Sequence, residues 1–220
     1  MNAERNRKER GSSMLIEQGV VAGNVTDKYG SRNPIHRWLM DGFLRKAETL
    51  VRKSGCVDAF EAGCGEGLLS LQLNARIPEL RIRGTDFSEQ VIAVARQNAA
   101  AQKRALQFTV ADIYSLTPSQ HGADLVLCCE VLEHLERPQE ALRILSRLAK
   151  KRLVLSVPNE PLWRVLNMAR GKYLGDFGNT PGHLNHWSPR GFREFLEREL
   201  IVEEMHNPTP WTMVLARPRV

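Results

Sequence analysis

Three glycines alternate with other residues in the stretch Glu61-Ala-Gly-Cys-Gly-Glu-Gly67. A strand-like run, 56–60, precedes them and a helix-like run, 68–77, follows, so they are expected in a strand-to-helix turn. Glycine permits dihedrals that side chains disfavour and lets a ligand approach the backbone closely, while free N–H groups at the helix start face the turn. The sequence therefore predicts a cofactor loop at Gly63, Gly65 and Gly67, although such turns also bind phosphates or only pack tightly.

A carboxylate follows the next predicted strand. Asp86 closes a segment, 80–85, in which apolar and polar residues alternate, and it lies 19 positions after Gly67. This is near the spacing at which an acidic residue binds ribose hydroxyls in nucleotide-binding folds. The alternative is that Asp86 only supports the helix for which Ser88 is the predicted N-cap.

Four motifs occur in a characteristic order along the chain. They are the glycine stretch 61–67, Gly84-Thr-Asp-Phe-Ser88, Val110-Ala-Asp-Ile113 and Asp124-Leu-Val-Leu-Cys-Cys-Glu-Val-Leu-Glu-His134. In this order and spacing, over about residues 35–157, the chain resembles the class I S-adenosylmethionine-dependent methyltransferases, and within them the ubiquinone-pathway O-methyltransferase-like branch. The resemblance implies S-adenosylmethionine as the cofactor.

The resemblance also implies which residues bind the parts of this cofactor. The glycine loop would hold the methionine part, Asp86 the ribose hydroxyls and Phe87 the adenine face, with Asp112 and Ile113 at the adenine edge. The full set of predicted cofactor-binding residues is Glu61, Gly63, Gly65, Gly67, Asp86, Phe87, Asp112, Ile113 and Glu130.

Charge and spacing agree with this choice over a dinucleotide. The spacing is G-x-G-x-G, whereas dinucleotide sites carry G-x-G-x-x-G. Glu61 and Glu66 would repel a pyrophosphate, but they suit a sulfonium cation that also carries an ammonium group.

The alternation of strands and helices predicts an α/β fold with a doubly wound, mostly parallel sheet, the Rossmann-like methyltransferase fold. We expect residues 1–28 to form a flexible basic tail and lead-in, and residues 29–220 to form a single methyltransferase domain. An insert, 158–188, would be a helical lid on the substrate side, and residues 201–220 would close the sheet as an antiparallel hairpin. An amphipathic helix over 35–51 would carry its apolar residues on one side, namely Trp38, Leu39, Phe43, Ala47 and Leu50. Tyr29 and Arg32 are expected near the site, with bracing of the turn before this helix as the alternative.

Composition limits the classes of function. The chain has 220 residues, 42% of them hydrophobic, and no apolar run approaches a membrane span, so a cytoplasmic location is expected. The net charge of +6 would suit an anionic partner, but aromatic content is only 6% and no basic-aromatic motif appears, so nucleic-acid binding is not expected. The four cysteines, 56, 64, 128 and 129, lack the spacing of a zinc or disulfide framework.

Three histidines are candidates for the base that an oxygen acceptor needs when it is methylated. His134 follows the predicted fourth strand, and His183 and His186 lie in the insert. Each could instead brace its loop. The leading hypothesis is O-methylation of a small, lipidic or aromatic hydroxyl acceptor without a metal.

Two other functions stay open. Glu130, Glu133, His134 and one of the insert histidines resemble the divalent-ion ligands of small-RNA 2′-O-methyltransferases, which would make the protein a metal-dependent RNA enzyme. A cofactor-binding protein without chemistry that acts through partners is the other alternative. Oligomeric state is left open.

A basic amphipathic stretch, 161–173, lies within the insert. Its apolar positions, Leu162, Val165, Leu166, Ala169 and Tyr173, recur at helical spacing, whereas Arg164, Arg170 and Lys172 lie off that stripe. Such helices can rest on a membrane, and the placement resembles the insert of ubiquinone-pathway O-methyltransferases. Packing on the protein's own core is the alternative, so peripheral membrane contact through this helix is one of two expectations.

Overall fold

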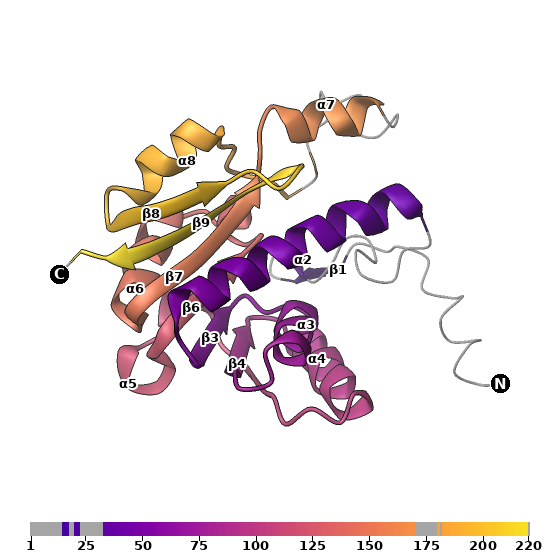
Figure 1. The fold of residues 1–220 in the computed structure, drawn as a ribbon, viewed down its shortest axis with the longest axis vertical. Coiled ribbons are helices and arrows are strands. Elements are labelled where there is room, and N and C mark those ends of the chain that lie inside the picture. The colour runs from indigo at the N-terminus through magenta and orange to yellow at the C-terminus, as the bar shows by residue number, and fades with distance from the viewer. Residues whose placement is uncertain (1–14, 18–19, 23–32, 170–179, 181, 220) are drawn as a thin grey trace.

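A mostly parallel sheet forms the centre of the protein (Figure 1). The computed structural model describes residues 15–17, 20–22, 33–169, 180 and 182–219. Seven strands pair in the order β5-β4-β3-β6-β7-β9-β8. Their bounds are β3 (Asp58–Ala62), β4 (Arg81–Asp86), β5 (Gln107–Val110), β6 (Ala123–Cys129), β7 (Ala149–Pro158), β8 (Leu200–His206) and β9 (Trp211–Pro218).

Strand pairing confirms the predicted α/β, doubly wound sheet. β3 pairs in parallel with β4 on one side and with β6 on the other, so the strand order reverses at β3. β8 and β9 form the predicted antiparallel hairpin, and β9 pairs antiparallel with β7. Ligands of open α/β sheets bind beyond the carboxyl ends of strands where the order reverses. The glycine stretch directly follows β3 and lies at this point.

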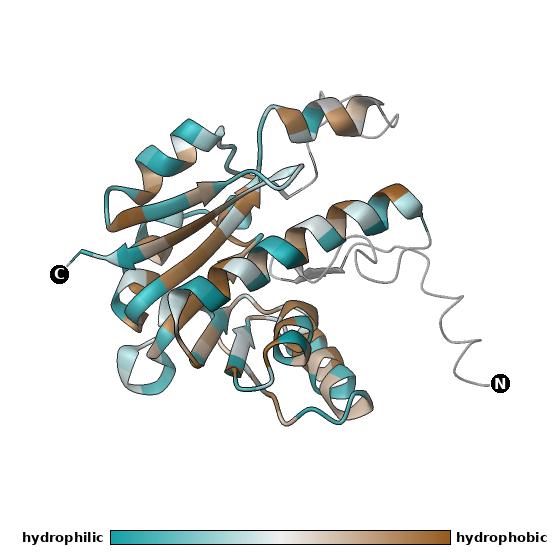
Figure 2. Ribbon diagram, viewed as in Figure 1, coloured by the Kyte–Doolittle hydropathy of each residue, from teal (hydrophilic) through white to brown (hydrophobic). Residues whose placement is uncertain are grey.

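Helices cover both faces of the sheet. Strand residues alternate between the faces, as a pleated strand requires. Phe60 and Val126 pack with α6 and α8, whereas Ala59 and Leu125 pack with α2 and α3, and Figure 2 shows hydrophobic colours concentrated on the central strands. The helices are α2 (Pro34–Ser54), α3 (Leu68–Arg76), α4 (Glu89–Ala101), α5 (Pro118–His121), α6 (Pro138–Leu148), α7 (Leu162–Ala169) and α8 (Pro189–Leu196), with short 3-10 helices η1 (Ile113–Ser115) and η2 (Leu132–His134).

α2, the helix that precedes the central sheet, differs from the prediction at one residue. The side chain of Asn33 caps its start, and Gly55 ends it in the left-handed region with φ of 65°. Phe43 is buried as predicted, but Trp38 is 65% exposed, so its placement on the packed side was wrong. The physical reason is that the buried stripe begins only at Met40, so the first turns extend beyond the residues that pack on the sheet.

The N-terminal stretch and the insert are described only in part. A short antiparallel pair, β1 (Leu15–Glu17) and β2 (Val20–Ala22), lies within the stretch predicted as tail and lead-in. α7 accounts for the first part of the amphipathic helix predicted over 161–173, and residues 170–179 lie outside the described residues, as do Tyr29 and Arg32. Within the described part of the chain, no helix has both the length and the apolar character needed to cross a membrane.

Candidate active site

The three loop glycines adopt left-handed backbone conformations. Their φ angles are 72° at Gly63, 54° at Gly65 and 72° at Gly67, a region that side chains disfavour. A Cβ at Gly63 would lie 2.4 Å from Cγ2 of Val131, and one at Gly67 would lie 2.7 Å from Cζ of Phe108. At Gly65, no described atom beyond its chain neighbours lies within 4 Å of the Cβ position. Packing therefore requires glycine at 63 and 67, whereas Gly65 borders open space that a ligand can fill.

Asp86 joins the glycine loop to the next helix. Its side chain is largely buried; Oδ2 accepts a hydrogen bond from the backbone amide of Gly65 over 3.0 Å, and Oδ1 accepts one from the amide of Ser88 over 3.1 Å. Ser88 itself caps α4 with its hydroxyl. A carboxylate has about four acceptor positions, so supporting the loop and binding ribose hydroxyls are compatible roles for Asp86.

The residues predicted at the adenine lie at the same edge of the sheet. The backbone amide of Ala111 donates to the carbonyl of Asp86 over 3.0 Å, which holds the ends of β4 and β5 together. Half-buried Phe87 directly follows Asp86. Asp112 is exposed and caps η1, and Ile113 is half-buried against the core.

Glu61 is a buried carboxyl group beside this loop. It is 3% exposed and accepts a hydrogen bond from the hydroxyl of Ser70 in the first turn of α3. Burial raises its pKa to about 7, with a smaller contribution from the negative charge of Asp86 and an opposing one from Ser70. Burial, Glu61 and Asp86 also raise the pKa of the Cys64 thiol. The ionisable groups beside the loop are thus acidic, and such surroundings suit a cation.

A cluster of two histidines and a carboxylate lies beyond the end of β6. Glu133, His134 and His183 each direct one potential ligand atom into it, all within 4.8 Å of one another. Nδ1 of His134 lies 2.8 Å from the carbonyl oxygen of Gly182, which can only accept, so this nitrogen carries the proton in the neutral ring. Nε2 is then an acceptor, and it faces Oε1 of Glu133 at 3.9 Å.

Backbone hydrogen bonds tie the end of the insert to this cluster. The amides of Leu184 and Asn185 both donate to the carbonyl of Glu133, over 2.8 and 3.0 Å. The side chain of Asn185 donates to the carbonyls of Leu132 and Leu135, over 3.2 and 2.6 Å. The sequence patterns did not indicate Asn185, although an asparagine between two histidines is a plausible anchor for a loop.

Glu130 points toward the C-terminal hairpin. Its backbone has φ of 60°, which is uncommon for a residue with a side chain. One carboxylate oxygen accepts a hydrogen bond from the hydroxyl of Ser156 over 3.1 Å, and the other accepts one from Nε1 of Trp211 over 2.7 Å. In this structure Glu130 is therefore outside the group formed by Glu133, His134 and His183. Sequence reasoning missed Ser156 and Trp211, because a pattern of strands does not show which side chain they meet.

Aromatic rings form a row from α2 to the insert. The ring centroids of Phe43 and Trp211 are 5.0 Å apart, those of Trp211 and Trp163 are 6.0 Å apart, and those of Trp163 and His183 are 6.2 Å apart in a stacked arrangement. Nε1 of Trp163 also donates to the hydroxyl of Thr180 over 2.8 Å. The row ends at the histidine cluster, where the rings of His134 and His183 meet edge to face at 4.9 Å.

His186 lies farther from the cluster centre. Its ring centroid is 6.5 Å from that of His183, and its Nε2 lies 3.4 Å from Nη2 of Arg164. Burial and the positive charge of Arg164 lower the pKa of His186. The structure thus brings His134 and His183 together and places His186 beside Arg164 of α7.

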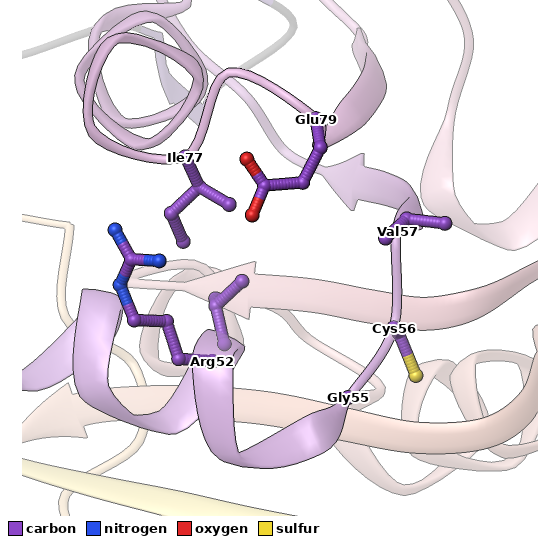
Figure 3. Close-up of a pocket in the computed structure, with 7 residues that line it drawn as sticks. Arg52, Gly55, Cys56, Val57, Ile77 and Glu79 are labelled. Atoms are coloured by element: carbon purple, nitrogen blue, oxygen red, sulfur yellow. The ribbon is translucent and has the colours of Figure 1, made fainter.

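A separate hollow of about 230 Å³ lies at the other end of β3 (Figure 3). Residues just before β3 and β4, Val57 and Glu79, line it together with Arg52 at the end of α2. The glycine loop leaves the opposite end of β3. This hollow is therefore not part of the candidate site.

Comparison with known proteins identifies relatives of this chain. Residues 59–152 match the methyltransferase domain family. Ubiquinone biosynthesis O-methyltransferase from Coxiella burnetii is 36% identical over 90 residues, which are 41% of this chain and 38% of that protein. The protein of the same name from Aeromonas salmonicida is 30% identical over 141 residues, covering 60% of this chain and 54% of that protein. The matched segments thus span at most about half of these two relatives.

Solved structures share the fold. Magnesium protoporphyrin IX methyltransferase from Synechocystis PCC 6803, with bound S-adenosylhomocysteine, superimposes with a TM-score of 0.67 at 21% identity. The match covers 86% of this chain and 90% of that one. At this identity the likeness shows a common fold and no more.

Proposed function

We propose that the chain is a class I S-adenosylmethionine-dependent methyltransferase, as the matches to known proteins support, and that it transfers a methyl group from S-adenosylmethionine to a hydroxyl oxygen of a small acceptor. The observation that carries this proposal is the position of the loop. Gly65 borders open space next to the carboxylate of Asp86, at the point where the strand order reverses.

The residues around the loop fit the cofactor. Open space at Gly65 accommodates a close ligand, and the buried carboxyl groups of Glu61 and Asp86 attract a cation. We assign the methionine part to Glu61 and the glycine loop, the ribose to Asp86, and the adenine to Phe87, Asp112 and Ile113. We also assign Glu130 to the cofactor site, because it directly follows the end of β6. The bound cofactor supplies an electrophilic methyl group on its sulfonium sulfur, and the neutral thioether that remains is a good leaving group.

His134 is the best-supported candidate for the base. Because its Nδ1 proton is directed at the carbonyl of Gly182, Nε2 is the accepting nitrogen of the neutral ring, and it lies on the side of Glu133. Such a nitrogen can take the proton of an acceptor hydroxyl, and the nearby carboxylate of Glu133 stabilises the imidazolium that forms. Orienting the acceptor oxygen in line with the methyl group supplies the larger share of the acceleration.

The aromatic row favours an acceptor with an aromatic ring. Half-buried Trp163 stacks with His183 of the histidine cluster, whereas Trp211 is buried against Trp163, and aromatic rings stack on flat apolar surfaces such as that of Trp163. The relatives named ubiquinone biosynthesis O-methyltransferase support an oxygen acceptor. We favour an aromatic hydroxyl acceptor over an RNA acceptor and over a protein without chemistry.

A divalent ion is a second candidate for activating the acceptor. Glu133, Nε2 of His134 and His183 bring acceptor atoms within 4.8 Å of one another, and acceptors directed at one point suit a cation. Mixed oxygen and imidazole ligands suit Mg²⁺, Mn²⁺ or Zn²⁺. An acceptor hydroxyl bound to such an ion would ionise at lower pH, which would replace the histidine base.

We also propose that α7 contacts the membrane surface, which would bring the enzyme close to a lipidic acceptor. Within the described residues of this helix, Met168 is 37% exposed and Arg164 lies near His186. Sedimentation with anionic vesicles at low and high salt would test it, because binding through basic residues weakens with salt. The cytoplasmic location and the domain bounds, 1–28 and 29–220 with the insert 158–188, stay predictions.

Calorimetry is the first test of the proposed function. The purified chain is titrated with S-adenosylmethionine and S-adenosylhomocysteine, with and without a chelator, and micromolar binding is expected for both. Turnover is then measured with small catechol and phenol acceptors. Absence of binding would overturn the proposal, and loss of turnover with retained binding after chelation would select the ion over the histidine base.

A further inference from the structure

Within the described part of the chain, no cationic group is among those that act on the pKa of buried Glu61. This residue is 3% exposed at the carboxyl end of β3, two residues before Gly63. Burial, the hydroxyl and backbone amide of Ser70, and the negative charge of Asp86 are those groups. An uncompensated buried carboxylate is unfavourable, and such a group takes up a proton unless a positive charge arrives.

Within the described residues, four elements contribute groups that interact with this carboxyl group. These groups are Ser70 on α3, Asp86 on β4 and Cys64 in the glycine loop. β6 adds two thiols whose pKa values the charge of Glu61 raises. The groups linked to Glu61 by a hydrogen bond or by charge are Ser70, Asp86, Cys64, Cys128 and Cys129. The three thiols stay protonated because burial raises their pKa values. Each of these groups is thus neutral or negative.

We infer that Glu61 balances the positive charge of the cofactor, and that its carboxyl group releases a proton to solvent when S-adenosylmethionine binds. The inference rests on the proposed function. S-adenosylmethionine carries a sulfonium and an ammonium, whereas S-adenosylhomocysteine has a neutral sulfur in place of the sulfonium. The two ligands therefore differ by one positive charge next to a carboxyl group that responds to charge.

This makes Glu61 a residue that determines specificity between cofactor and product. Once the methyl group has left, the sulfur is neutral, and the carboxylate loses the charge that kept it ionised. Proton uptake by Glu61 then accompanies the change from cofactor to product. Affinity for S-adenosylmethionine should rise with pH through the range near pH 7, and affinity for S-adenosylhomocysteine should rise less.

The magnitude follows from linkage. If the bound cofactor holds the pKa of Glu61 two units or more below its value of about 7 in the free protein, affinity should increase about eightfold between pH 6 and pH 7.5. At pH 6.5 the free carboxyl group is about three quarters protonated and the bound one almost fully ionised, so S-adenosylmethionine should release about three quarters of a proton.

Calorimetry of the full chain in two buffers with different ionisation heats measures this release. Both ligands are titrated at pH 6.5, and the dependence of the observed heat on the buffer gives the number of protons. Glu61→Gln should bind S-adenosylmethionine without this release and with an affinity that is nearly constant from pH 6 to pH 7.5. Asp58→Asn is the matched control, since it makes the same chemical change at the other end of β3 and should behave as wild type.

The outcomes separate this inference from the proposed function. Equal proton release by the two ligands in the wild-type chain, or unchanged release in Glu61→Gln, would overturn the role of Glu61 while methyl transfer stands. The wild-type comparison needs no variant, so it decides even where Glu61→Gln folds poorly. Absence of binding at any pH would overturn the proposed function together with this inference.

Discussion

Nε1 of Trp211 donates a hydrogen bond of 2.7 Å to the carboxylate of Glu130 and so joins the last strand of the sheet to the end of β6. The two residues are 81 positions apart in the chain. Glu130 holds a left-handed backbone conformation there, a strained arrangement that persists only when its surroundings over-determine it. The C-terminal hairpin thus helps to shape the edge of the sheet at which the candidate site lies.

Trp211→Phe should therefore affect both stability and turnover. The ring contact with Phe43 can remain, but the hydrogen bond to a carboxylate is lost, which should lower the free energy of unfolding by about 1.5–3 kcal/mol. Denaturant unfolding and turnover at saturating cofactor are the measurements. Trp187→Phe, which changes an indole packed on Phe192 and Phe195, is the control with a smaller expected effect on turnover. Equal turnover of the two variants would contradict a role for the Trp211 bond.

Asp86→Ala should weaken binding of S-adenosylmethionine by about 1.5–3 kcal/mol, as for a lost hydrogen bond to a charged group. The variant removes the proposed ribose acceptor and also the hydrogen bond from the amide of Gly65. Calorimetric titration measures the change. Asp124→Ala removes a surface ion pair with Lys151 and should leave affinity unchanged. An Asp86 variant with wild-type affinity would refute the ribose assignment.

Substitutions of the loop glycines should separate packing from binding. Gly65→Val directs its side chain into open space, so the fold should persist with a backbone penalty of about 1 kcal/mol while cofactor binding is lost. Gly63→Ala instead meets Val131 at 2.4 Å and should destabilise the fold itself. Thermal unfolding and calorimetry on both variants distinguish the two effects. Tight cofactor binding by Gly65→Val would exclude the loop as the seat of the methionine part.

The stability of the free protein should fall as pH rises from about 4.5 to about 7 because of Glu61. Its pKa is raised from 4.5 to about 7 in the folded chain, so between these values the folded state binds more protons than the unfolded state. At pH 8 the ionised group should lower the free energy of unfolding by up to about 3 kcal/mol. Glu61→Gln should remove this pH dependence and be more stable than wild type at pH 8. Denaturant unfolding at pH 5 and pH 8 tests this, and parallel profiles of the two proteins would contradict it.

Variants of the three histidines should rank their roles. His134→Gln should lower turnover by about 10²-fold, as expected for loss of a general base, with cofactor affinity intact. His183→Gln should also lower turnover, because this ring contacts His134 at 4.9 Å. His186→Gln should have the smallest effect, since its Nε2 is next to Arg164. Single-turnover rates with a catechol acceptor are the measurement, and full activity in all three variants would make the histidines structural.

Local features of the fold follow from the sequence with good accuracy. The glycine turn, the cap at Ser88 and the N-terminal Pro189 of α8 depend on neighbouring residues and backbone dihedrals. The alternation of strands and helices follows from periodicity in the same way. Trp38 is an exception, because helical periodicity assigns a side to a residue but does not show where the sheet beneath the helix ends.

Only the tertiary structure decides how distant side chains meet. The approach of His134 to His183 and the bond between Glu130 and Trp211 join segments separated by about 50 and 81 residues. The metal alternative grouped Glu130 with His134, since both follow the same strand, whereas the left-handed backbone at Glu130 directs its carboxylate to Ser156 and Trp211. The sequence by itself determined the glycine turn and the class of fold, because these depend on short-range backbone chemistry. Strand order and side-chain direction, which are long-range properties, decided the arrangement of the acceptor side.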